Sequence, residues 1–152
     1  MQRKWPGTQA KQFNWALENL PVEARWILRL DADEYLYPET IEEIKEKLGK
    51  LGEDVTGVIL KRRHVVGWLG DRWVRRGMYP TKLLRLYRTG CGICEERCMD
   101  EHIALARGRA VEFDGDFADH NLGTFDWWLD KHLGYAQREA RDGLEILARL
   151  KV

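Results

Sequence analysis

This chain of 152 residues lacks any long apolar run, since no stretch approaches the ~20 apolar residues that cross a bilayer. No positively charged start leads into an apolar secretory segment. These absences predict a cytoplasmic protein. An excess of one charge is also lacking, because 25 basic side chains balance 25 acidic ones, so nothing favours nucleic acid as a partner.

Repeats, linkers and low-complexity tracts are also missing from the sequence. Hydrophobic residues make up 44 % of the chain, which is ordinary for a globular protein and enough for one core. We therefore expect a single domain over residues 1–152.

Cysteine is scarce and clustered, with Cys91, Cys94 and Cys98 close together and His102 following. An odd, clustered set argues against a disulfide framework. Structural zinc sites usually pair two short ligand clusters across a longer span, and only one cluster is present here. Free thiols are the prediction, and zinc is the alternative.

An acidic motif follows a short apolar run, and it is the most informative feature of the chain. The run 26–30 (Trp-Ile-Leu-Arg-Leu) predicts a strand, and the acidic residues Asp31, Asp33 and Glu34 follow at its carboxyl end. If the backbone stays extended, Asp31 and Asp33 lie on the same side. Two such carboxylates suit Mg²⁺ or Mn²⁺ held together with a diphosphate. The alternative is a turn or a helix cap without a ligand.

Helical periodicity appears in three segments. Thr8 caps a predicted helix that Pro21 stops. A second helix is predicted over 38–50, with Ile41, Ile44 and Leu48 facing inward. Its charged residues, Glu43 included, are expected to be solvated on the outer face. An amphipathic helix is predicted from Thr124 onward. Its expected packing stripe consists of Phe125, Trp128, Leu129, His132, Tyr135 and Ala136.

Strand patterns fill the middle of the chain. Residues 55–66 and 82–88 predict two long strands, and residues 103–106 and 110–113 predict a hairpin that is followed by a turn at Asp114-Gly115. The segment 67–80 between the long strands predicts a loop over a ligand, in which Arg72, Arg75 and Arg76 could meet phosphates.

Five stretches occur in an order that resembles the family 2 glycosyltransferases of the GT-A fold, especially the bacterial enzymes that build lipopolysaccharide core and capsule sugars. They cover most of residues 11–138. The stretches are Lys11-Gln12-Phe13-Asn14-Trp15-Ala16-Leu17, Trp26 to Glu34, Tyr79-Pro80 with Leu84-Arg85-Leu86, Met99-Asp100-Glu101-His102, and Asp119-His120-Asn121. The resemblance implies an α/β fold, a partial GT-A domain with a mixed sheet flanked by helices and a long C-terminal amphipathic helix.

The resemblance also implies roles for individual residues. Asp33 would bind Mg²⁺ or Mn²⁺, Asp31 would contact the ribose or the metal, and His120 would complete the metal shell. Glu101, with Asp100 as the close alternative, would be the catalytic base of an inverting transfer. The sugar would pass from a nucleotide-diphosphate sugar to a glycan or lipid-linked glycan acceptor.

His64 and His102 are weaker candidates for the site. The implied acceptors make peripheral contact with the inner membrane surface an option, although the neutral net charge gives it no support.

Two other functions stay open. Family members carry about half a domain before the acidic motif, so we expect this chain to match the later part of such a domain, and a non-catalytic truncated domain that binds sugar and metal is an alternative. The motif Gly115-Asp116-Phe117-Ala118-Asp119 resembles the magnesium-binding motif of haloacid-dehalogenase-type phosphatases. Tyr35 stands where that family expects Thr or Val, which makes this alternative the weaker one.

Overall fold

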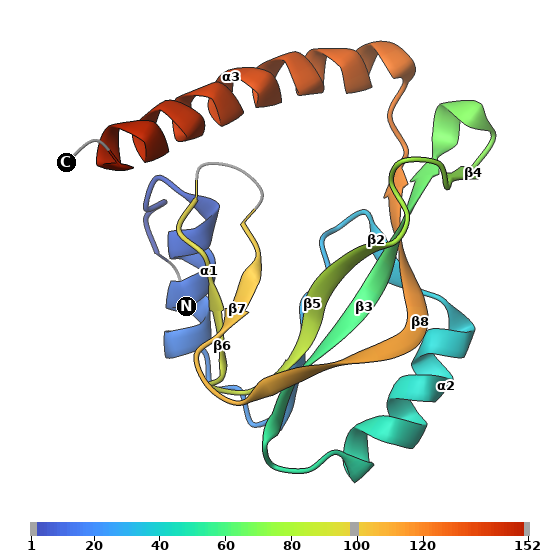
Figure 1. Cartoon of the computed structure of the whole chain (residues 1–152), viewed down its shortest axis with the longest axis vertical. Helices are drawn as coiled ribbons and strands as arrows, with labels where there is room; N and C mark the ends of the chain where they lie inside the picture. The colour runs from blue at the N-terminus through green and yellow to red at the C-terminus, as the bar shows by residue number, and fades with distance from the viewer. Residues whose placement is uncertain (1–2, 98–100, 151–152) are drawn as a thin grey trace.

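The structure, a computed structural model, describes residues 3–97 and 101–150 of an α/β protein built around a mixed, curled sheet (Figure 1). Strands β3 and β8 run parallel, and the other strand pairs described in the sheet are antiparallel. The strands in order across the sheet are β1 (Trp26–Leu28), β5 (Thr81–Arg88), β3 (Val55–Val66), β8 (Arg109–Asn121) and β2 (Glu34–Leu36), with β4 (Arg72–Val74) paired to β3.

The remaining elements surround this sheet. The helices are α1 (Gln9–Asn19), α2 (Pro38–Lys47) and α3 (Phe125–Leu150), with short 3₁₀ turns η1 (Leu48–Lys50) and η2 (Gly67–Leu69); β6 (Gly92–Cys94) and β7 (Ile103–Leu105) form a second sheet. Figure 1 shows α1 beside the β6–β7 pair, α2 at the opposite end of the main sheet, and α3 crossing above both. The mixed sheet flanked by helices and the long C-terminal helix are thus confirmed.

The predicted helix ends are confirmed where local chemistry sets them. The Thr8 hydroxyl accepts a hydrogen bond from the Lys11 N–H at the start of α1, and Pro38 occupies the first turn of α2. Ile41 is an exception on α2, because its side chain is exposed whereas Ile44 packs inward.

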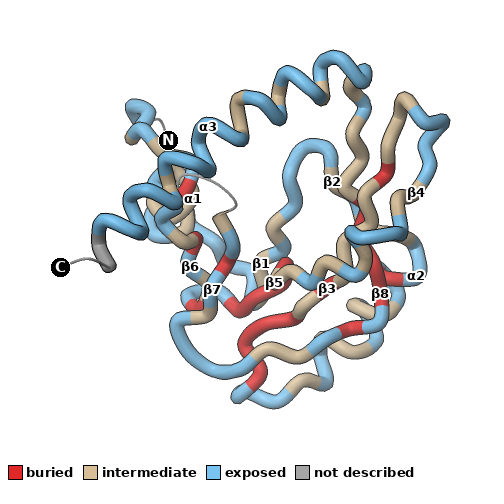
Figure 2. The backbone as a smooth tube through the Cα atoms, turned by 45° about the horizontal axis from the view of Figure 1, so that its top comes forward, coloured by how far each residue is buried: buried red, intermediate tan, exposed pale blue. Residues whose placement is uncertain are grey.

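Two apolar clusters make up the core, which Figure 2 shows as buried backbone along the central strands. The first lies under α2 and contains Val58, Leu60, Leu86, Phe113 and Phe117. The second joins α1 to β5 and β7 and contains Ala10, Tyr87, Cys94 and Ile103. Between them the clusters attach α1 and α2 to the sheet, while no α3 residue with a described side chain belongs to either.

The predicted hairpin over 103–113 is wrong. Strand β7 pairs with β6, whereas β8 runs through the predicted turn and pairs in parallel with β3. The register moves from Ile59 opposite Glu112 to Lys61 opposite Asp116, so the Asp114-Gly115 segment is a bulge within a strand. Glu43 accepts hydrogen bonds from both bulge N–H groups, which corrects the prediction that its charge is merely solvated.

Two more predictions need correction. The segment 67–80 is not a loop throughout, because it contains η2 and the short strand β4. The predicted packing stripe of α3 is largely exposed, including Phe125 and Leu129, because this helix lies apart from both core clusters.

Candidate functional site

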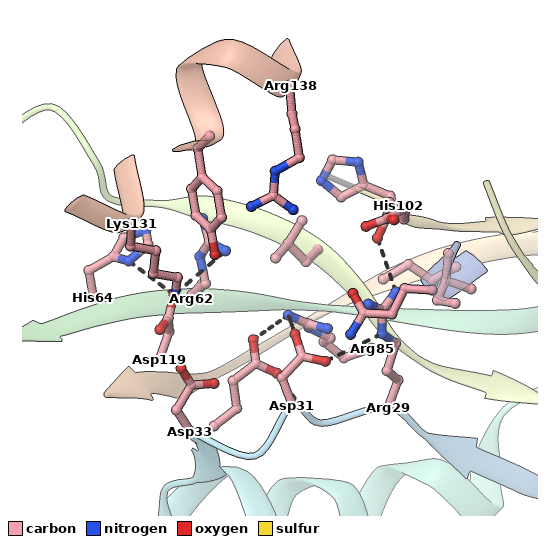
Figure 3. A pocket seen from close by; sticks show the side chains of 17 residues that line it. Arg29, Asp31, Asp33, Arg62, His64, Arg85, His102, Asp119, Lys131 and Arg138 are labelled. Carbon is pink, nitrogen blue, oxygen red and sulfur yellow. Dashed lines mark hydrogen bonds and ion pairs between the residues drawn. The ribbon is translucent and has the colours of Figure 1, made fainter. Parts of the chain in front are cut away.

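A cavity of about 470 Å³ lies between the main sheet, α3 and the segment that leads into β7 (Figure 3). Its lining is strongly charged. Five carboxylate and five cationic side chains reach it: Asp31, Asp33, Glu34, Glu101 and Asp119, with Arg29, Arg62, Arg85, Lys131 and Arg138. Gln9, His64, His102 and Tyr135 complete the polar lining. A cavity with this lining suits a polar ligand that carries charge.

The acidic motif forms a turn between β1 and β2 rather than extended backbone. Strand β1 ends at Leu28, and the Glu34 N–H donates to the Asp31 carbonyl at 3.0 Å. The period-two argument for Asp31 and Asp33 therefore fails, although both side chains still line the cavity. The His120 N–H donates to the Asp33 carbonyl at 2.8 Å, which ties this turn to β8.

The two aspartates have different surroundings. The Asp31 carboxylate lies 3.7 Å from Arg29 and 4.0 Å from Arg85, so its charge is balanced by the protein. In the part of the chain that the structure describes, the Asp33 carboxylate has no hydrogen bond or ion pair. Asp33 is thus the carboxylate of this pair that is available to a ligand.

A buried ion pair between Glu34 and Arg85 lies beneath this turn. The exposed fraction of the side chain is 3 % for Glu34 and 6 % for Arg85. Burial raises the pKa of the Glu34 carboxyl and lowers the pKa of the Arg85 guanidinium, because desolvation penalises both charged forms. The guanidinium also stacks 4.8 Å from the centre of the Phe117 ring.

A histidine and an aspartate meet on the neighbouring strands. The parallel register places His64 opposite Asp119, and His64 Nδ1 lies 3.2 Å from Asp119 Oδ2, with Arg62 at 3.7 Å from the same carboxylate. Burial raises the pKa of Asp119, but the hydrogen bond from His64 and the charges of His64, Arg62 and Lys131 together outweigh it and hold that pKa below its ordinary value. Asp119 is therefore an ionised group of the cavity wall.

The structure brings only some of the predicted residues to the cavity. Glu101 lines it, and its carbonyl accepts from Arg29 Nη1 at 3.0 Å. His120 turns its ring to Asp71, with Nε2 2.8 Å from Oδ1, and does not line the cavity. Asp100, the alternative base, lies outside the described residues.

The predicted phosphate-contacting arginines also lie away from this cavity. The Arg75 guanidinium stacks 4.5 Å from the centre of the Trp73 ring, and Arg76 is exposed. Neither lines the cavity. Arg62 and Arg85 are among the cations that do line the cavity. Both are strand residues, and the sequence does not single them out as phosphate contacts because a charged side chain on a strand is normally solvated.

The cysteine segment adjoins the acidic turn, because Cys94 and Asp31 line a second, smaller cavity together with Arg29. Cys91 and Cys94 are buried free thiols, and their sulfurs accept from Arg107 Nε at 3.3 Å and from Arg29 Nη1 at 3.8 Å. Burial raises the pKa of the Cys94 thiol. Cys98 lies outside the described residues.

The phosphatase-like motif is divided between two environments. Asp116 is buried and binds Arg63 and Tyr79, whereas Asp119 faces His64 and the cavity. Residues three apart on a strand project to opposite faces, so this spacing does not bring the two carboxylates together.

A preformed metal cluster is not found among residues 3–97 and 101–150, in the sense of three or more His, Cys, Asp or Glu groups able to hold an ion. Mg²⁺ bound with a substrate diphosphate needs only one or two protein carboxylates, because phosphates and water supply the other oxygens. The exposed Asp33 carboxylate beside Asp31 fits that requirement.

No protein-family model matches this chain, and no curated protein matches it either.

Within the described residues, no helix, α3 included, has the length and apolar character needed to cross a membrane.

Proposed function

We propose that this chain is the later part of a metal-dependent glycosyltransferase domain of the family 2, GT-A type, which transfers a sugar from a nucleotide-diphosphate sugar to a glycan or lipid-linked glycan with inversion. One observation carries the proposal. The unpaired Asp33 carboxylate and two cations of α3 that form no ion pair in the described residues, Lys131 and Arg138, line one polar cavity.

Figure 3 shows these groups on opposite sides of the cavity, with Asp31 and Asp33 below and Lys131 and Arg138 above. A nucleotide diphosphate with a divalent cation has a matching distribution of charge, since the cation meets carboxylates and the phosphate oxygens meet Lys and Arg. Arg29, which already balances Asp31, is a further phosphate partner.

Asp33 and Asp31 would hold Mg²⁺ or Mn²⁺, which offsets negative charge on the departing nucleotide diphosphate. Glu101 is the proposed base, because its side chain lines the cavity and has no hydrogen bond or ion pair within the described part of the chain. Its carboxylate would take the proton of the acceptor hydroxyl as that oxygen bonds to the anomeric carbon and the bond to the diphosphate breaks.

The first experiment measures ligand binding by thermal unfolding. Mn²⁺ and a nucleoside diphosphate (UDP or GDP) added together should raise Tm more than either alone, because only the pair satisfies both sides of the cavity. Asp33→Asn should abolish this joint effect. Asp114→Asn is the matched control, because Asp114 is 95 % exposed and does not line the cavity.

The second experiment measures release of nucleoside diphosphate from a panel of nucleotide-diphosphate sugars. Glu101→Gln should slow release by about 10² to 10⁴ and leave the Tm shift intact, which separates the base from the binding groups. Binding without release from any donor or acceptor mixture would instead identify the non-catalytic sugar- and metal-binding domain. Undiminished metal and nucleotide binding by Asp33→Asn would falsify the metal assignment.

A further inference from the structure

The second, smaller cavity has a volume of about 160 Å³ and adjoins the main one. Four residues line both spaces, namely Gln9, Arg29, Asp31 and Glu101. The rest of the lining of the smaller cavity is less polar and consists of Phe13, Leu30 and Cys94. We call this space the side cavity, and the four shared residues its mouth.

The walls of the side cavity are held in place by the core. Arg29 Nη1 donates to the Glu101 carbonyl at 3.0 Å and to the Cys94 sulfur at 3.8 Å, and its guanidinium lies 5.2 Å from the centre of the Phe13 ring. The Asn14 side chain binds the backbone N–H and carbonyl of Cys94, both at 2.8 Å. Cys94 belongs to the second core cluster, and Phe13 packs against it. The side cavity is therefore preformed, as binding pockets usually are.

The size of the side cavity limits what it can hold. Pockets that enclose a whole small ligand usually measure about 300 to 1,000 Å³. A single water needs about 30 Å³ or less. A cavity of about 160 Å³ lies between these two sizes. It therefore suits one substituent of a ligand whose body occupies the main cavity.

The lining requires a substituent that is apolar at one end and forms hydrogen bonds at the other. A hydroxyl group would leave the apolar walls of Phe13 and Leu30 in contact with water. A methyl group would leave the polar side chain of Gln9 at the mouth without a partner. A carboxylate is disfavoured, because the carboxylates of Asp31 and Glu101 already border the mouth.

We propose that the side cavity binds the acetamido group of a 2-acetamido sugar carried by the donor nucleotide. The methyl group packs against Phe13 and Leu30, the amide carbonyl accepts a hydrogen bond from the Gln9 side chain, and the amide N–H donates to a carboxylate at the mouth. This inference rests on the proposed function, and it specifies the donor that the same site takes.

The position of the side cavity selects the substituent at C2 of the donor. Its mouth includes Asp31, a proposed ligand of the cation that holds the diphosphate, and Glu101, the proposed base at the acceptor oxygen. Figure 3 shows Arg29 beside Asp31 at this end of the main cavity. The diphosphate and the acceptor oxygen both bond to the anomeric carbon in the course of the transfer. C2 is the ring carbon bonded to the anomeric carbon, so its substituent is the one that reaches a space between these two residues.

Isothermal titration calorimetry in the presence of Mn²⁺ tests the inference with two donors that differ only at C2. UDP-N-acetylglucosamine carries the acetamido group, and UDP-glucose carries a hydroxyl in its place. The first should bind at least about 10-fold more tightly, because only the acetamido group has both an apolar end and an amide to match the side cavity. The ratio of the two dissociation constants is the preference to be compared among variants.

Two variants assign the preference to the side cavity. Leu30→Phe should remove it, because Leu30 lines the side cavity but not the main one, and the larger ring fills the space. Leu122→Phe is the matched control and should keep it, because Leu122 is 77 % exposed and lines neither cavity. Gln9→Met should reduce the preference without filling the space, since it removes the amide and keeps a chain of similar length. Circular dichroism should show the same helix content in all four proteins.

The outcomes separate this inference from the proposed function. UDP-N-acetylglucosamine that binds no more tightly than UDP-glucose, or that does not bind, overturns the inference. If the joint effect of Mn²⁺ with UDP or GDP on Tm is present in that case, the proposed function stands. A preference that survives both Leu30→Phe and Gln9→Met also overturns the inference, because the acetamido group then lies elsewhere. Absence of the joint effect on Tm overturns the proposed function, and this inference with it.

Discussion

Replacing Arg85 by methionine should destabilise the protein strongly, because it leaves a buried carboxylate without its cation. The Glu34 side chain is only 3 % exposed and has Arg85 as its ion-pair partner. Removing one member of a buried pair typically costs about 3 to 5 kcal/mol. Asp31 adds little to this loss, because it is half exposed and 4.0 Å from the guanidinium. We expect Tm to fall by about 10 °C.

The assay is urea unfolding followed by tryptophan fluorescence, with Glu34→Leu/Arg85→Met as the matched double variant. The double variant should recover most of the lost free energy of unfolding, because it removes both buried charges and keeps apolar volume. A loss below about 1 kcal/mol for Arg85→Met, or a double variant no more stable than the single one, would refute this reasoning.

The pH dependence gives an independent check on the same variant. Burial already raises the pKa of Glu34 in the parent, and losing Arg85 should raise it further. A folded-state pKa above the unfolded value means that the folded protein binds the proton more tightly. The deficit of Arg85→Met should therefore be smallest below the ordinary carboxyl pKa and grow as pH rises through the folded pKa of Glu34.

Three other substitutions test the core and the cavity wall. Gly92→Ala should destabilise the protein by about 1 to 3 kcal/mol in urea unfolding, because the new Cβ would lie 2.3 Å from the fully buried Tyr87 ring. Leu60→Ala should cost about 2 to 5 kcal/mol in the same assay, since Leu60 is fully buried in the first core cluster. The lowered pKa of Asp119 stabilises the folded protein above the ordinary carboxyl pKa, and this stability is lost as pH falls through the pKa of the folded state. Asp119→Asn should therefore remove this fall in the free energy of unfolding when unfolding is measured between neutral and acidic pH.

Local chemistry in the sequence predicted the helices and the long strands. Thr8 caps the first helix through its side chain, and Pro21 cannot continue it. The helix α1 therefore begins and ends close to the predicted positions. The unbroken run of residues 55–66 predicted β3, and the period of α3 predicted an amphipathic helix. The acidic turn was also found as a candidate site, although its backbone was expected to be extended.

The tertiary structure alone decided which strands pair and which side chains share the cavity. His64, rather than the predicted His120, lies against Asp119 in the cavity wall. The reason is that β8 runs parallel to β3 in a register that places these two residues, 55 positions apart in the chain, opposite each other. A shift of one residue on a strand exchanges the faces, and no local pattern fixes that register. The exposure of α3 has the same origin. Periodicity shows that a helix has an apolar side, but only the tertiary structure decides that Lys131 and Tyr135 line the cavity while Leu129 and Leu133 are exposed.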